Sequence, residues 1–135
     1  EGAQVFLYNR TRAKAQALAT AAKAKVVAKS ELKKLSFAAI VHATPVGQYP
    51  KIGESLLEPD EIHAPLVYDL VYNPLETELA RRARAAGAQV IPGLEMLVTQ
   101  GARQFELWTG KPAPVADMRA EVLRALTPAA PRPAD

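Results

Sequence analysis

The feature that most constrains the fold is a regular alternation of short apolar runs with longer stretches of helical periodicity. Short apolar runs indicate buried strands, and strands that alternate with helices indicate parallel strands joined by helical crossovers. The pattern therefore predicts an α/β protein with a mostly parallel sheet and helices on both faces. Strands are predicted at 4–8, 25–28, 37–42, 66–70 and 89–91, and helices at 11–22, 30–35, 77–86, 94–108 and 115–126.

The length of the chain predicts one domain with its own hydrophobic core. It has 135 residues, and domains usually contain about 100–150. We place this domain at residues 1–126. The last segment, 127–135, is rich in proline and alanine, and this composition predicts a disordered tail.

Composition excludes several classes of function. The net charge is only +3, which argues against a nucleic-acid partner. No apolar run approaches the about 20 residues needed to cross a bilayer, so no membrane association is expected. Cysteine is absent, which excludes disulfides, thiolate metal sites and cysteine nucleophiles. This absence suits a reducing compartment, and the predicted location is the cytoplasm.

Turn-forming residues follow the predicted strands at one edge of the sheet. In open α/β sheets, ligands bind in the crevice outside the carboxyl ends of the strands. Any one of these turns is adequately explained as an ordinary loop, but four together predict an assembled ligand site. The four turns are Asn9–Thr11, Ala43–Gly47, Tyr72–Pro74 and Pro92–Gly93.

The first of these turns is basic and lies directly before a helix, where Thr11 is the expected cap. An acidic residue at this point would suit the ribose 2′-hydroxyl of NAD, whereas an arginine suits the 2′-phosphate of NADP. Arg10 can stack on adenine and pair with phosphate oxygens, and Lys14 adds a charge on the same helix face. Asn9, Arg10, Thr11, Arg12 and Lys14 are thus predicted to bind NADP. A capped helix with solvated basic residues is the alternative.

Two further polar residues follow later strands. Tyr72 and Gln100 can hydrogen-bond a polyhydroxylated ligand, and neither is a strong acid or base at neutral pH. Packing for Tyr72 and plain surface exposure for Gln100 are the alternatives. Gly93 either allows close approach of a cofactor ring or forms an ordinary turn. His42, at a strand end beside Thr44, is interpreted as a structural histidine.

Several catalytic patterns are absent from the sequence. It contains no G-x-G-x-x-G, no Walker lysine and no H-E-x-x-H. No cluster of histidine and carboxylate residues has the spacing of metal ligands, so no metal is predicted. No obvious general base is present, and no catalytic residue is assigned within the chain.

Five motifs, taken in order, closely resemble the C-terminal half of the shikimate dehydrogenase family. The resemblance extends from residue 4 to about 126. Each motif is weak alone, and their occurrence in register makes the resemblance specific. They are Asn9-Arg10-Thr11, Ala43-Thr44-Pro45-Val46-Gly47, the Tyr68-Asp69…Tyr72…Pro74…Thr77 segment, Gly93…Met96-Leu97…Gln100, and Trp108-Thr109-Gly110.

The resemblance implies a Rossmann-like, NADP-binding domain of a two-domain oxidoreductase. Such enzymes use NADPH to reduce 3-dehydroshikimate to shikimate in aromatic amino-acid biosynthesis. By position, the resemblance assigns Asn9, Arg10, Thr11 and Lys14 to the 2′-phosphate, Leu70 and Gly93 to the nicotinamide, and Tyr72 and Gln100 to shikimate.

The sequence departs from the family at several points. The family usually has asparagine at the position of His42, often methionine at that of Gln48, and commonly arginine at that of Lys14. The first strand, the glycine-rich diphosphate loop and the catalytic lysine–aspartate pair are expected upstream of residue 1. The 135 residues alone are therefore expected to be inactive.

Two alternative functions remain open at this point. One is a quinate/shikimate dehydrogenase paralogue, and the other is a non-catalytic fragment that serves only as a binding or dimerisation module. As for partners, an open sheet edge would favour pairing with a second copy, as a homodimer.

Overall fold

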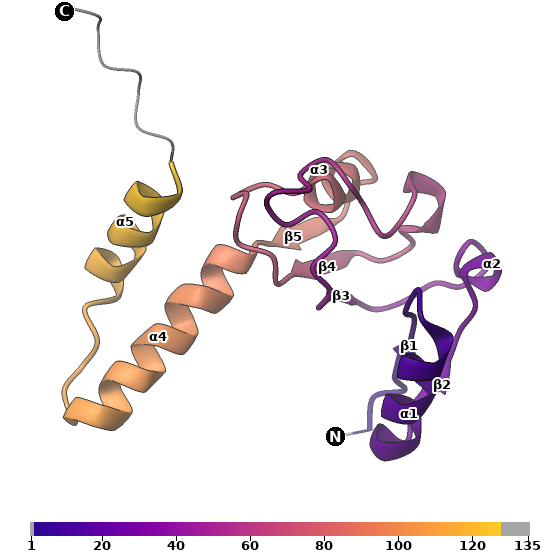
Figure 1. Cartoon of the computed structure of the whole chain (residues 1–135), viewed down its shortest axis with the longest axis horizontal. Helices are drawn as coiled ribbons and strands as arrows, with labels where there is room; N and C mark the ends of the chain where they lie inside the picture. Colours follow the sequence, from indigo (N-terminus) through magenta and orange to yellow (C-terminus); the bar gives the residue numbers. More distant parts are fainter. Residues whose placement is uncertain (1, 128–135) are drawn as a thin grey trace, which may run out of the picture. The chain divides into compact units, whose positions relative to one another are not determined.

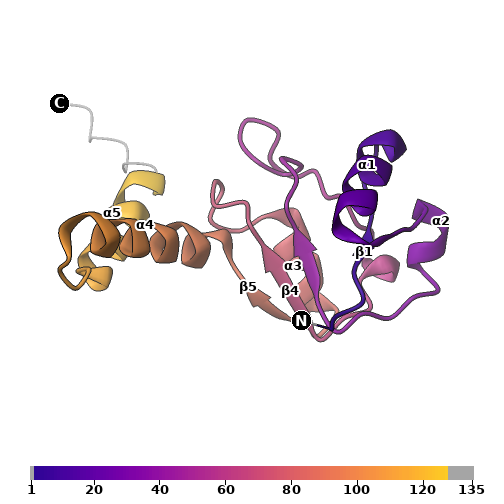
Figure 2. The same ribbon diagram turned by 90° about the horizontal axis from the view of Figure 1, so that it is seen from below.

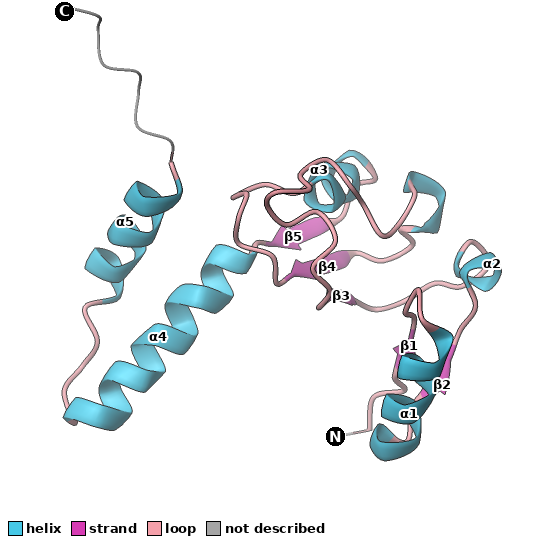
Figure 3. Cartoon of the chain, viewed as in Figure 1, coloured by secondary structure: helices cyan, strands magenta, loops and turns pink. Residues whose placement is uncertain are grey.

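The computed structural model describes residues 2–127, so the predicted tail lies almost wholly outside the described residues. Within them, strands and helices alternate as the sequence predicts (Figure 1; Figure 3). The strands are β1 (Phe6–Leu7), β2 (Lys25–Val26), β3 (Ile40–His42), β4 (Leu66–Asp69) and β5 (Gln89–Ile91). The helices are α1 (Arg12–Ala22), α2 (Lys29–Leu32), α3 (Glu78–Ala85), α4 (Gly93–Thr109) and α5 (Val115–Leu126), with a 3₁₀ turn at Pro59–Glu61.

The chain forms two compact units, Glu1–Ser36 and Phe37–Asp135, each with its own parallel sheet. In the first unit β1 pairs with β2, and in the second the strand order is β3-β4-β5. The doubly wound order is 3-2-1-4-5-6, in which strand 1 lies between strands 2 and 4. The observed pairings match 3-2 and 4-5-6. Parallel pairing in both sheets, with helices alternating with strands along the chain, confirms the predicted α/β fold class.

The Glu1–Ser36 unit has a small core and locally stabilised turns. Ala15 and Ala19 of α1 are buried, together with Val27 and Leu32. The expected Thr11 cap is wrong in detail: the Thr11 side chain makes no capping hydrogen bond. Instead, Asn9 Oδ1 accepts a hydrogen bond from the Thr11 backbone N–H at 2.8 Å. The short asparagine side chain can reach the backbone two residues further on, so Asn9 rather than the Thr11 side chain stabilises this turn.

The start of α2 also differs from the prediction. The sequence predicts a helix that Ser30 caps, but the helix begins at Lys29, so Ser30 lies inside it. The carboxylate of Glu31 accepts a hydrogen bond from the Ala28 N–H at 2.6 Å. Glu31 therefore pairs the backbone N–H of Ala28, the residue at the N-cap of α2.

The Phe37–Asp135 unit has the more deeply buried core. Val67 of β4 and Leu79 and Ala83 of α3 are almost fully inaccessible, and α3 packs against β4 and β5. The start of α3 agrees with the prediction, because Thr77 Oγ1 accepts a hydrogen bond from the Ala80 N–H at 3.0 Å. This fixed helix start holds Thr77 beside the end of β4.

The two C-terminal helices of this unit lie side by side (Figure 2). An ion pair between Arg119 of α5 and Glu95 of α4 joins them, whereas α5 itself has no buried residue. Among the described residues, no helix combines the length and apolar character required to cross a membrane.

Candidate functional site

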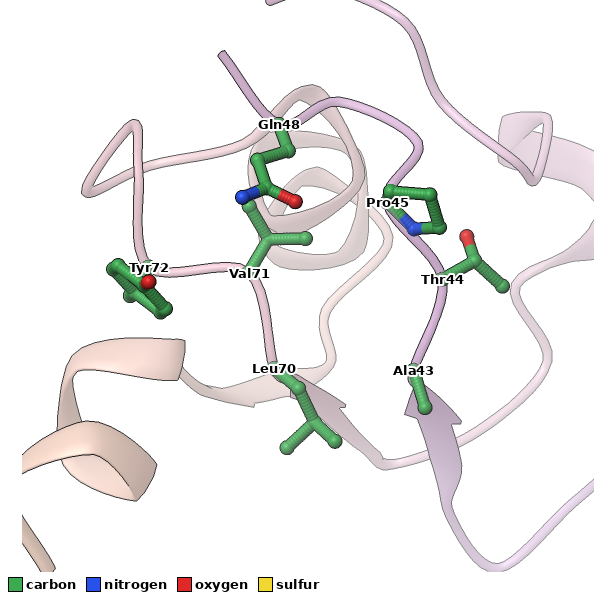
Figure 4. A pocket seen from close by; sticks show the side chains of 7 residues that line it. All are labelled: Ala43, Thr44, Pro45, Gln48, Leu70, Val71 and Tyr72. Carbon is green, nitrogen blue, oxygen red and sulfur yellow. The ribbon is translucent and has the colours of Figure 1, made fainter. Parts of the chain in front are cut away.

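A pocket lies at the carboxyl ends of two neighbouring strands in the Phe37–Asp135 unit. Its cavity has a volume of about 270 Å³. Figure 4 shows two walls, one following β3 and the other following β4. We call these the β3 wall, formed by Ala43, Thr44, Pro45 and Gln48, and the β4 wall, formed by Leu70, Val71 and Tyr72. The location is the one predicted for a ligand site in an open α/β sheet.

A buried hydrogen-bond network lies behind both walls. His42 and Asp69 end neighbouring strands and are paired in register, and they are 3% and 1% exposed. His42 Nδ1 lies 2.9 Å from Asp69 Oδ1, and His42 Nε2 lies 2.8 Å from Thr44 Oγ1. The Thr77 hydroxyl donates to Asp69 Oδ2. The polar groups at this sheet edge are thus satisfied by one another, as burial requires.

The Asp69 carboxylate is held in its charged form. Burial alone would raise its pKa, but hydrogen bonds from His42, Thr77 and the Val71 backbone N–H lower the pKa below the ordinary value. Asp69 is therefore an acceptor of hydrogen bonds at neutral pH. It fixes the start of the β4 wall because its Oδ1 accepts from the Val71 N–H at 3.0 Å.

Gly93 makes a close backbone contact that no other residue could make. A Cβ placed there would lie 2.3 Å from the Val71 carbonyl oxygen and 2.8 Å from the Leu70 carbonyl carbon. The start of α4 therefore packs directly on the backbone of the β4 wall. The sequence predicted a close approach at Gly93, and the approach found in this structure is to the chain's own backbone.

Only some of the residues predicted to contact nicotinamide and substrate lie at the pocket. Leu70 and Tyr72 line the pocket, and Gly93 packs beneath the first of them. Gln100 is exposed on α4 and is not among the lining residues. It lies seven residues after Gly93, or about 10 Å along the helix axis.

The predicted phosphate-binding turn lies in the Glu1–Ser36 unit. Arg10, Thr11, Arg12 and Lys14 are all exposed, and α1 has no acidic residue in its first turn. Cations are unfavourable at a helix N-terminus, where the backbone dipole and free N–H groups favour an anion. Three basic side chains at that end are therefore poorly explained by helix stability alone.

Sequence reasoning did not identify the network as a whole. It treated His42 as an isolated structural residue and did not connect it with Thr44, Asp69 and Thr77. The useful signal was strand register, because parallel pairing of 37–42 with 66–70 places His42 opposite Asp69. Gln48 and Val71 were also not predicted as pocket residues.

The side chains that line the pocket limit the chemistry it can perform. The seven lining residues include no aspartate, glutamate, histidine, lysine or cysteine. Within residues 2–127, no group of three or more histidine, cysteine, aspartate or glutamate side chains could hold a metal ion. The pocket can therefore orient a ligand through Thr44, Gln48 and Tyr72, but it supplies no strong acid or base.

A parallel sheet with a pocket at the carboxyl ends of its strands is the arrangement in which open α/β proteins bind nucleotides and other ligands. Comparisons with known proteins make this more specific. Residues 93–123 match the family described as the shikimate 5′-dehydrogenase C-terminal domain. Over most of its length the chain is similar to members of the shikimate dehydrogenase family.

Known relatives match the chain over most of its length. The NADP(+) shikimate dehydrogenase of Methanosarcina barkeri is 40% identical over 93% of this chain and 49% of its own length. A shikimate 5-dehydrogenase structure from Thermus thermophilus, in complex with NADP(H) and shikimate, has a TM-score of 0.82. It is 36% identical and is matched over 93% of this chain and 47% of its own.

A quinate dehydrogenase from Corynebacterium glutamicum in complex with NAD is also similar. Its TM-score is 0.74 at 28% identity, over 91% of this chain and 46% of its own. The chain thus spans about half the length of the relatives that it matches.

Proposed function

We propose that this chain is the NADP-binding part of a shikimate dehydrogenase, an oxidoreductase that reduces 3-dehydroshikimate to shikimate with NADPH. The observation that carries the proposal is the exposed basic turn at the N-terminus of α1. Arg10, Arg12 and Lys14 cluster where three cations lower helix stability and where an anion is favoured. The 2′-phosphate of NADP is the anion that this arrangement fits.

The turn itself is ordered for binding. The hydrogen bond from the Thr11 N–H to Asn9 Oδ1 fixes the backbone directly after Arg10. The planar guanidinium of Arg10 pairs with phosphate oxygens and stacks on the adenine, while Lys14 contributes a point charge. Thr11 adds a hydroxyl that no capping bond occupies.

The pocket at the ends of β3 and β4 is the proposed site of the nicotinamide and substrate. Leu70 packs against the nicotinamide, and Gly93 keeps α4 close to the wall that carries Leu70. Tyr72 donates a hydrogen bond to a shikimate oxygen from the same wall. Gln100 reaches the substrate from α4.

The chain's own residues orient the reactants and exclude water from the apolar part of the pocket. NADPH supplies the hydride when it is bound. The pocket lining has no acid or base to move the accompanying proton. In the family that the chain resembles, a lysine assisted by an aspartate transfers this proton.

Calorimetric titration tests the proposal directly. NADPH is expected to bind this chain more tightly than NADH, because only NADPH carries the 2′-phosphate. Arg10→Gln should weaken NADPH binding by about tenfold more than NADH binding, the size of one charge-assisted hydrogen bond, because NADH loses only the stacking of Arg10 on the adenine. Lys23→Gln is the matched control, since it removes one charge at the opposite end of α1.

An equal loss of NADPH affinity in Arg10→Gln and Lys23→Gln would mean that the basic turn acts only through general electrostatic attraction. Equal affinity for NADPH and NADH in the unsubstituted chain would contradict the proposed cofactor and would favour the non-catalytic module.

Quinate is the second candidate substrate, because the similar Corynebacterium glutamicum enzyme is a quinate dehydrogenase in complex with NAD. Shikimate and NADPH remain the preferred pair, since Arg10 occupies the position where an NAD enzyme would favour an acidic residue. Competition between shikimate and quinate for the chain distinguishes the two substrates.

The proposed setting follows from composition and strand pairing. The absence of cysteine suits the cytoplasm. An open strand edge favours a homodimer, and the sedimentation velocity of the chain at several concentrations would reveal it.

A further inference from the structure

Both nitrogens of His42 are used, and each reaches a group that holds one wall of the pocket. Asp69 Oδ1 lies 2.9 Å from His42 Nδ1 and also accepts the Val71 N–H of the β4 wall at 3.0 Å. Thr44 Oγ1 lies 2.8 Å from His42 Nε2 and also accepts the Val46 N–H at 3.3 Å. Val46 lies between Pro45 and Gln48 of the β3 wall. The imidazole thus connects the two walls through one acceptor on each side.

The direction of each hydrogen bond follows from the chemistry of the partners. A charged Asp69 carboxylate only accepts, so His42 Nδ1 carries a proton and donates it. With Nδ1 protonated, Nε2 of a neutral imidazole is an acceptor and takes the hydroxyl proton of Thr44. The lone pairs of Thr44 Oγ1 then remain available for the Val46 N–H. Every donor in the chain from Val71 to Val46 is paired in this arrangement.

Burial keeps water from the bond between His42 and Asp69, whereas Thr44 is half-buried. His42, Asp69 and Thr77 are each 3% exposed or less. Two direct backbone bonds join the segments that carry the walls: the Leu70 N–H donates to the His42 carbonyl oxygen at 3.0 Å at their base, and the Tyr49 N–H donates to the Asn73 carbonyl oxygen at 2.9 Å just beyond them. Above the first of these bonds, the side-chain hydrogen bonds that link residues 42–48 with residues 69–72 run through the His42 ring.

We propose that His42 is a positioning residue that sets the separation of the β3 and β4 walls, and so the ligand affinity of the pocket, through its simultaneous bonds to Asp69 and Thr44. The inference rests on the proposed function only for the identity of the ligands. The connection between the walls is a property of the chain itself. Holding the two walls at a fixed separation requires a group that bonds both of them, and His42 is that group.

The test uses substitutions that remove the hydrogen bond of His42 Nε2 alone or the bonds of both nitrogens. In His42→Asn, the amide occupies the place of Nδ1 and bonds Asp69, but it does not reach Thr44. In His42→Phe, the ring remains and both bonds are lost. Thr44→Val removes the hydroxyl while keeping the shape of the side chain. Amide hydrogen exchange of Val46 and Val71 in the full chain reports each wall separately.

Each variant has a distinct expected result. His42→Asn and Thr44→Val should accelerate exchange at Val46 by about tenfold and change Val71 by less than about twofold, since one hydrogen bond is lost. His42→Phe should accelerate exchange at both amides. The amides of Val98 and Ala102, buried in α4, are the internal control.

Two exchange results would overturn the proposal. One is unchanged Val46 exchange in His42→Asn, which would mean that Thr44 holds the β3 wall without His42. The other is equal acceleration at Val46, Val71, Val98 and Ala102, which would mean that His42 only stabilises the unit as a whole.

Binding of NADPH and shikimate supplies the second measurement. His42→Asn should weaken binding by about three- to tenfold. The double variant His42→Asn/Thr44→Val should bind no more weakly than Thr44→Val alone, because both changes remove the same bond. Additive losses would count against the proposal. If the unsubstituted chain binds neither ligand, the proposed function fails, while the exchange results still decide the role of His42 in holding the walls.

Discussion

The candidate sites of the two units are built in opposite ways. In the Glu1–Ser36 unit, the basic turn is a contiguous stretch that is exposed from Arg10 to Lys14 and has one local side-chain hydrogen bond, from the Thr11 N–H to Asn9. In the Phe37–Asp135 unit, the pocket depends on residues separated by up to about fifty positions, including His42, Asp69 and Gly93, which are buried. Exposed charges contribute little to stability, whereas buried polar groups cost free energy if a partner is lost. Changes in the first unit should therefore alter binding, and changes in the second should alter stability as well.

The largest expected effect is at Gly93. Gly93→Ala places a Cβ within 2.3 Å of the Val71 carbonyl oxygen, and it should lower the free energy of unfolding by about 3 kcal/mol through overpacking. Gly101→Ala is the matched control, because nothing lies within 4 Å of its Cβ position in the same helix. It should raise stability by about 0.5–1 kcal/mol through helix propensity. Denaturant unfolding followed by circular dichroism measures both, and equal effects would contradict the close packing at the β4 wall.

The next effect is the pH-dependent contribution of Asp69. Its folded-state pKa is lowered below the ordinary value of 3.8. The charged carboxylate therefore stabilises the unit fully above about pH 4, and this contribution is lost as the pH falls through the lowered pKa. Asp69→Asn should cost about 2–3 kcal/mol at pH 7, since it removes one partner of a buried pair.

The stability difference between the two proteins isolates Asp69 from other carboxylates. Glu78, for example, has a pKa of about 2 because hydrogen bonds from Arg81 and Arg82 favour its charged form. The difference between the unsubstituted chain and Asp69→Asn should be constant from pH 7 to 5 and should shrink below pH 4. A difference that stays the same at pH 3 would show that the Asp69 charge does not hold the β4 wall.

The smallest effect has the opposite sign. Arg12→Gln removes a cation from the first turn of α1, where positive charge opposes the helix dipole. It should raise the stability of the Glu1–Ser36 unit by about 0.3–1 kcal/mol while weakening NADPH binding. Thermal unfolding and titration of the same sample provide both values. A loss of stability would mean that the basic residues support the helix, and the contrast between the units would then disappear.

Local features were predictable from the sequence. The strand and helix alternation, the Thr77 cap of α3 and the position of the pocket at the strand ends all follow from short-range patterns and one rule of sheet topology. The structure differs from the prediction at Thr11 and Ser30, where the side chains that bond the backbone are those of Asn9 and Glu31, which accept from the Thr11 and Ala28 N–H groups. Sequence spacing alone does not decide which side chain bonds the backbone, because the choice depends on the backbone angles of the turn.

The sequence by itself determined a parallel α/β chain and an arginine-containing turn at the start of a helix, because both are written in neighbouring residues. The tertiary structure alone decided that His42 contacts Asp69 and Thr44 at once and that Gly93 packs on the Val71 backbone. These contacts join segments far apart in the chain. The distances in these contacts depend on the register of the strands and on the packing of the helices. Both are set by burial of side chains across the whole sheet, so they exist only once the sheet has formed.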